Sequence, residues 1–192
     1  MTTTPPISMP AGVRGHLTIC ALYSDGRRRV LSDRKNQIVF GFLSSVARLI
    51  TQAPADAAAL SQLAVHALWV ESSETAFLTG VTPSDQGPAG AVAKQYVFDR
   101  DSDVDVNVDG TAGLVEFRAV VDKSECNGLI LRAAGLYTRG DNDDPSLTTN
   151  PTLVARQLFG AIEKQPEFAL EFSWRIQLSI LTDSEASNAG DD

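Results

Sequence analysis

The stretch FALEFSWRIQLSIL, residues 168–181, alternates large apolar side chains with polar or small ones along its whole length. Successive side chains of a strand point to opposite faces, so this period of two predicts a long β-strand with one buried face. That face would carry Phe168, Leu170, Phe172, Trp174, Ile176, Leu178 and Ile180. Such a face has to be covered by a second apolar layer, which favours a β-sandwich.

Other stretches extend this pattern through most of the chain. Further strands are expected from the apolar or alternating runs at residues 63–70, 94–108, 113–121, 129–137 and 152–159. Near the N-terminus, residues 16–23 and 27–31 flank Ser24-Asp25-Gly26, a sequence typical of a hairpin turn. The fold class predicted is mainly β (α+β), an antiparallel β-sandwich with an N-terminal hairpin and one packed helix.

The helix is predicted for residues 36–50, where the period changes to helical spacing. Ile38, Phe42, Val46 and Leu49 share one face at this spacing, and Ser32 or Asp33 precedes them as an N-cap. Gly41 weakens such a helix by about 1 kcal/mol unless it permits close packing.

A long surface loop is expected for residues 71–90, which are rich in Ser, Thr, Gly and Pro. Phe77, Leu78 and Val81 form an isolated apolar cluster in this polar stretch. They are candidates for a contact buried against a neighbouring subunit.

The length of 192 residues, with 43% hydrophobic and 21% charged residues, predicts one globular domain. We expect it to span residues 13–182, between a flexible N-terminal arm at 1–12 and a disordered acidic tail at 183–192. The N-terminus lacks the charged and apolar regions of a secretory signal, and no apolar run reaches the length of a membrane span. Cys20 and Cys126 are therefore expected to be reduced and buried, and a single disulfide between them is the alternative.

Charge is divided unevenly along the chain. Residues 1–60 carry a net charge of +4 and the remainder −12, which gives the overall −8. An acidic chain of this kind does not favour nucleic-acid binding, which needs a dense positive surface. A basic end and an acidic end do suit head-to-tail docking between copies of the chain, or onto other proteins.

The sharpest local match lies at Asp105-Val-Asn107-Val-Asp109-Gly110, followed by Glu116. This spacing satisfies the calcium loop in which alternating oxygens and a bidentate glutamate surround the ion. Valines with strand periodicity flank it instead of helices, which favours a hairpin with an Asp-Gly turn and with Glu116 pointing outward. Calcium bound in such a non-helical setting remains the alternative.

Two further short motifs are assigned to ordinary surface features. Arg139-Gly140-Asp141 is the integrin-binding tripeptide, but three residues carry little information and a surface loop accounts for them. Arg27-Arg28-Arg29 follows a turn without an aromatic stacking platform, so it is interpreted as solvated turn charge, as one side of a subunit contact or as protection of an exposed strand edge.

No combination of residues points to catalysis. His16 and His66 lie in apolar strand runs, where a structural role is the common one, and nothing supports pairing Cys20 with His66. Nucleophile-elbow, phosphate-loop, dinucleotide and zinc motifs are absent from the sequence. We therefore predict a protein that is not an enzyme, with no catalytic, cofactor-binding or metal residue and no small-molecule substrate.

Several motifs in a fixed order resemble one family. They are Lys35-Asn36-Gln37-Ile38 opening the helix, Leu63-Ala-Val65, Ala134-Gly135-Leu136-Tyr137, and a closing group of Leu153-Val-Ala-Arg156, Lys164 and Leu170-Glu-Phe-Ser-Trp174-Arg-Ile-Gln-Leu178. In this order they are similar to the N-terminal domain of bacteriophage tail-collar fibre proteins and related short tail proteins. The chain departs from that family's pattern at His66 and Ala133, and no fibrous rod follows Leu181.

The resemblance implies a phage virion structural protein assembled in the bacterial host cytoplasm. It would be an adaptor or attachment component of the tail, collar (neck) or baseplate that joins fibres or neighbouring virion proteins. The implied partners are copies of itself, in a trimer or ring, and other virion proteins, without nucleic acid or membrane. The alternatives are a head decoration protein and a calcium-dependent binding module.

Overall fold

The computed structural model describes residues 11–38, 41–42, 45–46, 63–77, 80–82, 84–109, 112–139 and 151–180. Within these residues the chain is mainly β and forms nine strands. They are β1 (Ala11–Tyr23), β2 (Arg28–Ile38), β3 (Val65–Ser72), β4 (Ala91–Val97), β5 (Val104–Asp109), β6 (Ala112–Val121), β7 (Ile130–Thr138), β8 (Leu153–Glu163) and β9 (Phe168–Ile180). None of the described helical residues belongs to a helix long and apolar enough to cross a membrane.

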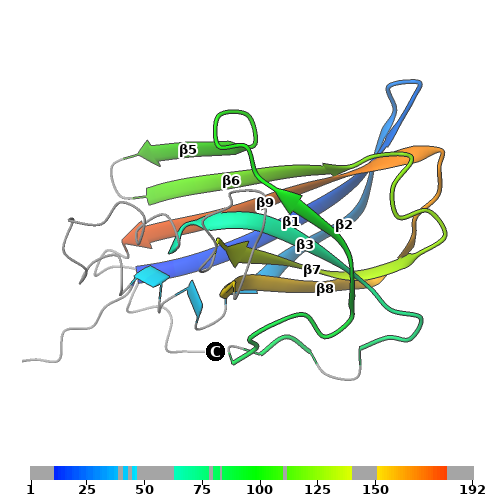
Figure 1. Cartoon of the computed structure of the whole chain (residues 1–192). Coiled ribbons are helices and arrows are strands. Elements are labelled where there is room, and N and C mark those ends of the chain that lie inside the picture. The colour runs from blue at the N-terminus through cyan, green and yellow to red at the C-terminus, as the bar shows by residue number, and fades with distance from the viewer. Residues whose placement is uncertain are drawn as a thin grey trace, which may run out of the picture.

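The strands form the predicted antiparallel β-sandwich, whose two layers are visible in Figure 1. Sheet A has the order β2-β1-β9-β6-β5, and sheet B has the order β4-β3-β7-β8. The two sheets join through the end of β2, where Gln37 and Ile38 pair with Arg156 and Ala155 of β8. On the opposite side, residues 98–103 cross from β4 in sheet B to β5 in sheet A.

The core lies between the sheets and is built by the alternation predicted for β9. Leu170, Phe172, Trp174 and Ile176 are each at most 3% exposed, and they pack with buried residues of β3, β7 and β8. Leu178, at the end of the same face, is 41% exposed. The apolar pattern therefore predicts the buried face correctly along most of the strand.

Both predicted hairpins are confirmed. The N-terminal one turns through Gly26, whose φ of 83° lies in the left-handed region that glycine tolerates, and the Tyr23 amide donates to the Arg27 carbonyl at 3.0 Å. The other pairs β5 with β6, with Asp105 opposite Glu116. The alternating run at residues 94–108 is divided between β4 and β5 by the crossover.

The beginning of the predicted helix is wrong. Ser32, Asp33 and Asn36 belong to β2 and pair with β1, and Gln37 and Ile38 continue the strand by pairing with β8, so neither Ser32 nor Asp33 caps a helix. Gly41, Phe42, Ser45 and Val46 are helical, and the other residues between 39 and 50 lie outside the described residues. Gly41 lies so close to the Leu153 carbonyl that any Cβ would collide with it, which supports the close-packing role.

The loop between β3 and β4 forms a partial third layer over the outer face of sheet B. Val81 packs on a cluster formed by Ala67, Trp69, Tyr137 and Leu153, in which the Trp69 and Tyr137 rings stack at 4.2 Å between centroids. Glu71 and Ser72, at the start of the predicted loop, belong to β3. The arm boundary also shifts, because β1 begins at Ala11; residues 1–10 and the tail at 183–192 lie outside the described residues.

Candidate docking surface

The outer face of sheet A is polar because it carries the alternate residues of strands whose other face forms the core. On β9, Glu171, Ser173 and Arg175 alternate with the buried Leu170, Phe172, Trp174 and Ile176 and point away from sheet B. The neighbouring strands add further charged residues, so this face carries many polar groups. This contrasts with sheet B, whose outer face lies under the β3–β4 loop.

Glu116 of β6 is a carboxylate on this face that three neighbouring side chains contact. Its side chain is only 10% exposed, and its Oε1 accepts hydrogen bonds from Ser173 Oγ at 2.6 Å and Arg118 Nε at 3.1 Å. Arg175 Nε lies 3.4 Å from Oε2. Burial opposes ionisation, but these bonds and the charge of Arg175 outweigh it and lower the pKa of Glu116 to about 2.

Cys20 lies on the same face and is 1% exposed. Burial raises the pKa of its thiol; Arg28 opposes the shift, and Glu171 and Asp33 add to it. Arg28 itself forms an ion pair with Glu171. A buried thiol with a raised pKa is an inert structural group, since thiolate is the reactive form.

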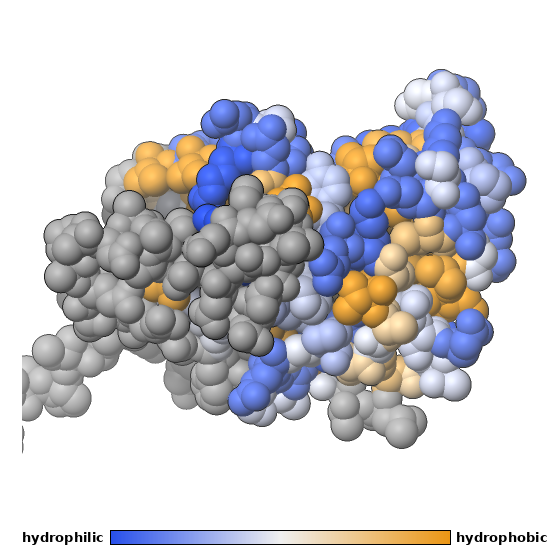
Figure 2. Space-filling view, in the orientation of Figure 1, coloured by the Kyte–Doolittle hydropathy of each residue, from blue (hydrophilic) through white to orange (hydrophobic). Residues whose placement is uncertain are grey.

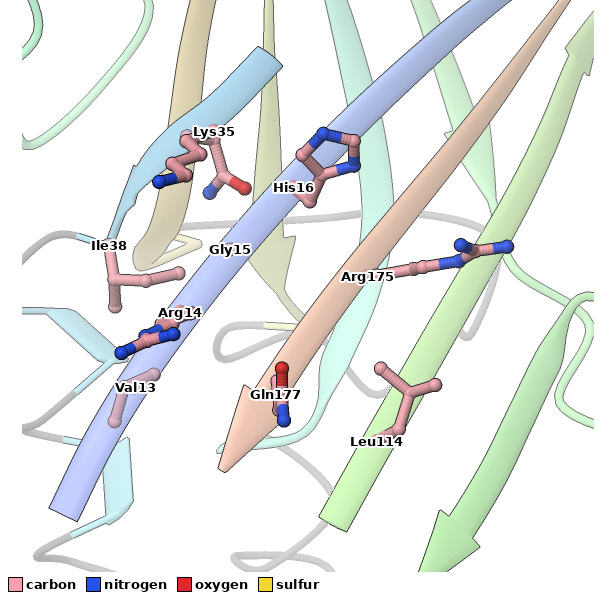
Figure 3. A pocket seen from close by; sticks show the side chains of 10 residues that line it. Val13, Arg14, Gly15, His16, Lys35, Ile38, Leu114, Arg175 and Gln177 are labelled. Atoms are coloured by element: carbon pink, nitrogen blue, oxygen red, sulfur yellow. The ribbon is translucent and has the colours of Figure 1, made fainter. Parts of the chain in front are cut away.

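A hollow of about 560 Å³ opens at the end of this face where β1 begins and β9 ends (Figure 3). Its charged lining is entirely basic and comprises Arg14 and His16 from β1, Lys35 from β2 and Arg175 from β9. Among the described residues, the salt bridges include neither Arg14 nor Lys35, whereas His16 lies 3.4 Å from Asp33. Arg14 and Lys35 therefore bring positive charge to the hollow without a described ion-pair partner, whereas Arg175 lies beside Glu116.

The basic charge continues along the lateral edge of sheet A. From Arg28 to Asn36, β2 pairs with β1 on one side, and in the described part of the chain its other side has no strand partner until Gln37. A second hollow of about 420 Å³ lies beside this free edge and is lined by Arg34, Lys35, Asn36, Gly80, Val81, Gln157 and Leu158. We call the exposed cations Arg29, Arg34 and Lys35 of β2 the basic edge.

The opposite edge of sheet A is acidic. β5 pairs only with β6 among the described residues, and the crossover and β5 together present Asp99, Asp101, Asp103 and Asp105, which we call the acidic edge. Asp103 shapes the crossover, since it accepts hydrogen bonds from Tyr96 Oη at 3.0 Å and from the Asp99 amide at 2.9 Å. Burial and the hydrogen bond to Asp103 raise the pKa of Tyr96 to about 12.

Apolar side chains are exposed on the same edge strand. Val106 and Val108 of β5 are 61% and 74% exposed, on the side of the strand opposite to Asp105. In Figure 2 this edge shows a hydrophobic strip over β5 beside hydrophilic side chains of the crossover. An open strand with exposed valines can pair with another chain.

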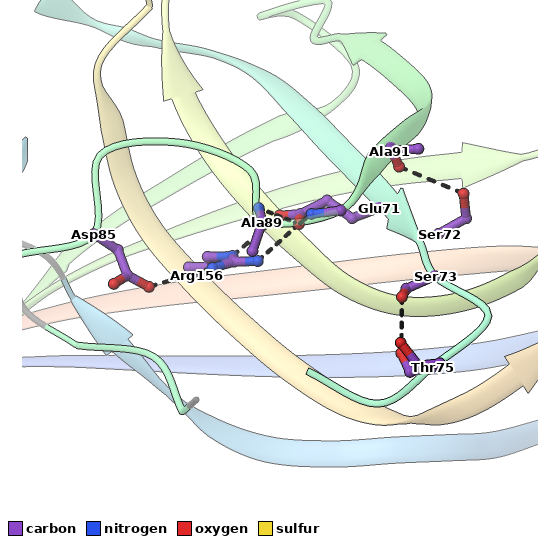
Figure 4. Close-up of polar contacts among 9 residues, drawn as sticks. Glu71, Ser72, Ser73, Thr75, Asp85, Ala89, Ala91 and Arg156 are labelled. Atoms are coloured by element: carbon purple, nitrogen blue, oxygen red, sulfur yellow. Dashed lines mark hydrogen bonds and ion pairs between the residues drawn. The ribbon is translucent and has the colours of Figure 1, made fainter. Parts of the chain in front are cut away.

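The outer face of sheet B has a different charged centre, a buried ion pair beneath the loop (Figure 4). Glu71 and Arg156 side chains are 0% and 6% exposed and form a two-point contact, with Nε–Oε1 at 3.1 Å and Nη2–Oε2 at 2.7 Å. Glu71 Oε2 also accepts the amides of Ala89 and Gly90 at 2.9 and 3.0 Å, and Arg156 Nη1 reaches Asp85 at 3.3 Å. The pair thus ties the loop to the sheet.

The calcium-loop residues lie in extended strands and not in a compact loop, as the hairpin interpretation predicts. Asp105 and Asn107 point from the outer face of β5, and the side chain of Asp109 lies outside the described residues. Glu116 lies on the same face but is not freely solvated, because Ser173 and two arginines engage it. The described residues contain no group of three or more His, Cys, Asp or Glu placed to hold a metal ion.

The arginines of the two short motifs have ordinary surroundings. Arg139 follows the end of β7, its amide donates to the Ala64 carbonyl, and Gly140 and Asp141 lie outside the described residues. In the Arg27-Arg28-Arg29 run, Arg27 pairs with Asp25 and lies over the Tyr23 ring. Arg28 and Arg29 belong to β2, and Arg29 is exposed on the basic edge, which is compatible with a turn charge, a subunit contact and edge protection alike.

The histidines and cysteines are not brought together. His16 lies on the outer face of sheet A, and His66 is half-buried in β3 of sheet B. Cys20 and Cys126 are both free; Cys126, in the loop before β7, is half-buried and donates to the Ala93 carbonyl at 3.7 Å. The predicted reduced state agrees with this arrangement.

The apolar loop residues contact their own chain. Phe77 lies against the Arg156 guanidinium at 5.4 Å, Val81 packs on the Trp69 cluster, and Leu78 lies outside the described residues. The Glu71–Arg156 pair could not be predicted from the sequence, because 85 residues separate its members and no local pattern connects them. No known family model, curated protein or solved structure matches the chain.

Proposed function

We propose that the chain is a structural protein of a bacteriophage virion, an adaptor or attachment component of the tail, collar (neck) or baseplate. It would assemble as a homo-oligomer, a trimer or ring, and join fibres or neighbouring virion proteins. The observation that carries the proposal is the charged and laterally open sheet A. Its unpaired basic and acidic edges offer surfaces of the kind that direct protein association.

The resemblance to tail-collar fibre proteins supports this role from the sequence. Its motif residues contribute to the framework that holds the surface: Leu136 and Trp174 lie in the core, and Lys35 lies on the basic edge. The buried Lys164 ammonium donates to the carbonyls of Lys123 and Gln165 and to Asn127 Oδ1, at 2.9 to 3.3 Å. These contacts fix the loop before β7 and keep that end of the sandwich rigid.

Immunogold electron microscopy of particles from a lysate of the source tests the proposal. Antibody against this chain should label the neck, tail or baseplate. Label over the head would replace it with head decoration, and particles without label would overturn the virion role. Calorimetry with calcium addresses the remaining alternative, a calcium-dependent binding module, and we expect no binding heat at Asp105 and Glu116 because arginines already neutralise Glu116.

The N-terminal arm is proposed to contact a neighbouring virion protein. Because β1 begins at Ala11, the informative truncation removes residues 1–10 and leaves the strand complete. The truncated chain should fold normally, with an unchanged circular dichroism spectrum, but should be lost from particles. Normal incorporation would exclude this role for the arm.

A further inference from the structure

We propose that the basic edge of one copy docks against the acidic edge of a second copy, so that sheet A continues from subunit to subunit. The inference rests on the proposed self-assembly and specifies the two surfaces that would carry it. Both edges belong to the outermost strands of sheet A, which are β5 and β2, and β2 joins sheet B only through Gln37 and Ile38. A contact between two different surfaces of identical chains is head-to-tail, and it forms a ring when the rotation closes.

The strand geometry permits this contact. The four neighbouring pairs from β2 to β5 are all antiparallel, so β2 and β5 run in the same direction. Copies placed side by side in the same orientation therefore bring the two edges together as parallel neighbours. β2 has a free side along Arg28 to Asn36, and β5 has one along its whole length, in the described part of the chain.

The charges select this pairing over the two alternatives. Contacts between two β2 edges would oppose Arg29, Arg34 and Lys35 to the same cations, and contacts between two β5 edges would oppose aspartates. Only the mixed contact places opposite charges together, and like-charge juxtaposition is what excludes wrong partners. No described salt bridge engages these three cations or the exposed Asp99, Asp101 and Asp105, so their charges are available to a neighbour, whereas Asp103 is held by Tyr96 and the Asp99 amide.

A hollow beside β2 and the exposed apolar side chains of β5 also support contact between these two edges. The hollow of about 420 Å³ lies directly beside the free side of β2, between Lys35 and Gln157 of β8. The occupant would bring the exposed Val106 and Val108, which lack a cover in the described part of the chain. Burying them adds a salt-independent contribution to a contact that charge directs.

Two charge-reversal variants of the full chain, studied first separately and then as a mixture, test the proposal. The basic-edge variant is Arg34→Glu/Lys35→Glu, and the acidic-edge variant is Asp101→Lys/Asp105→Lys. Each should remain folded but run as a monomer in light scattering, where the wild type is an oligomer. A mixture of both variants restores one complementary contact per pair and should give a heterodimer containing one chain of each, detected with two different tags.

A matched control changes charge elsewhere. Glu74→Lys/Glu167→Lys alters the net charge as the acidic-edge variant does, at exposed loop positions away from both edges, and should assemble like the wild type. Assembly of the wild type should also weaken at high salt.

Each other outcome overturns the inference in an identifiable way. An oligomer that persists in both variants would assign the interface elsewhere and leave the proposed assembly standing. A wild type that stays monomeric at every concentration would overturn both. Loss of assembly in the basic-edge variant alone would indicate another acidic occupant of β2, such as residues 183–192.

Discussion

Each outer face of the sandwich carries a carboxylate paired with arginine, but the arginine is buried on sheet B and the arginines are exposed on sheet A. On sheet B, Glu71 and Arg156 are buried beneath a loop of the same chain, and Phe77 covers the guanidinium. On sheet A, Arg118 and Arg175 remain more than half exposed around Glu116. Among the described residues, a loop of the same chain covers the first face and nothing covers the second, which is why we propose sheet A as the assembly surface.

The largest expected effect comes from breaking the covered face. Arg156→Met leaves the Glu71 carboxylate 0% exposed without its cation, and breaking a buried pair in this way costs about 3–5 kcal/mol. The urea unfolding midpoint should fall strongly, and limited proteolysis should cut the β3–β4 loop sooner than in the wild type.

Arg118→Met is the matched control on the open face. The Arg118 side chain is 57% exposed, so its ion pair with Glu116 contributes less than about 1 kcal/mol. Equal losses in the two variants would contradict the distinction between the faces. The double variant Glu71→Gln/Arg156→Met should recover part of the stability, because no buried charge remains.

A smaller loss of stability is expected at Gly90, where the β3–β4 loop returns to sheet B. A Cβ on Gly90 would lie 2.7 Å from the Ser72 carbonyl oxygen and 3.0 Å from the Phe77 ring, so Gly90→Ala has to displace the loop. Crowding of this kind costs about 1–3 kcal/mol. Gly87→Ala in the same loop meets nothing within 4 Å and should change the unfolding midpoint little. Identical midpoints for the two variants would show that the loop does not press on β3 at Gly90.

The same contrast explains what the sequence can and cannot predict. The β9 face was predictable because alternation is local and Phe172 and Trp174 sit on one side of it. The start of the helix was mispredicted because Ile38 and Phe42 have helical spacing, whereas the pairing of Asn36 with Gly15 depends on a strand distant in sequence. Strand pairing outweighs local propensity at such a position.

The candidate surface was predictable only as a charge imbalance. The division between +4 in residues 1–60 and −12 beyond them indicates two oppositely charged regions. It does not reveal that Lys35 and Asp105 lie at the two lateral edges of one sheet, since the strand order β2-β1-β9-β6-β5 brings together distant segments. The covering of sheet B was likewise hidden, because Arg156 finds Glu71 only in the folded chain.

The smallest effect concerns the open face and depends on pH. The folded pKa of Glu116, about 2, lies below the ordinary glutamate value of 4.5, so its ionised form stabilises the fold above about pH 4.5. That contribution is lost as the pH falls from 4.5 through about 2. Because both arginine partners are largely solvated, we expect about 1–2 kcal/mol.

Comparison of wild type with Glu116→Gln isolates this contribution, since every other carboxylate titrates in both proteins. The wild type should be the more stable of the two at neutral pH, and the difference in unfolding free energy should shrink toward zero as the pH approaches 2. A difference that stays constant with pH would mean that Glu116 acts through its shape and its bond to Ser173, and not through its charge. In that case the hydrogen bond from Ser173 to Glu116 would stabilise the outer face of sheet A, and the ion pairs of Glu116 with Arg118 and Arg175 would not.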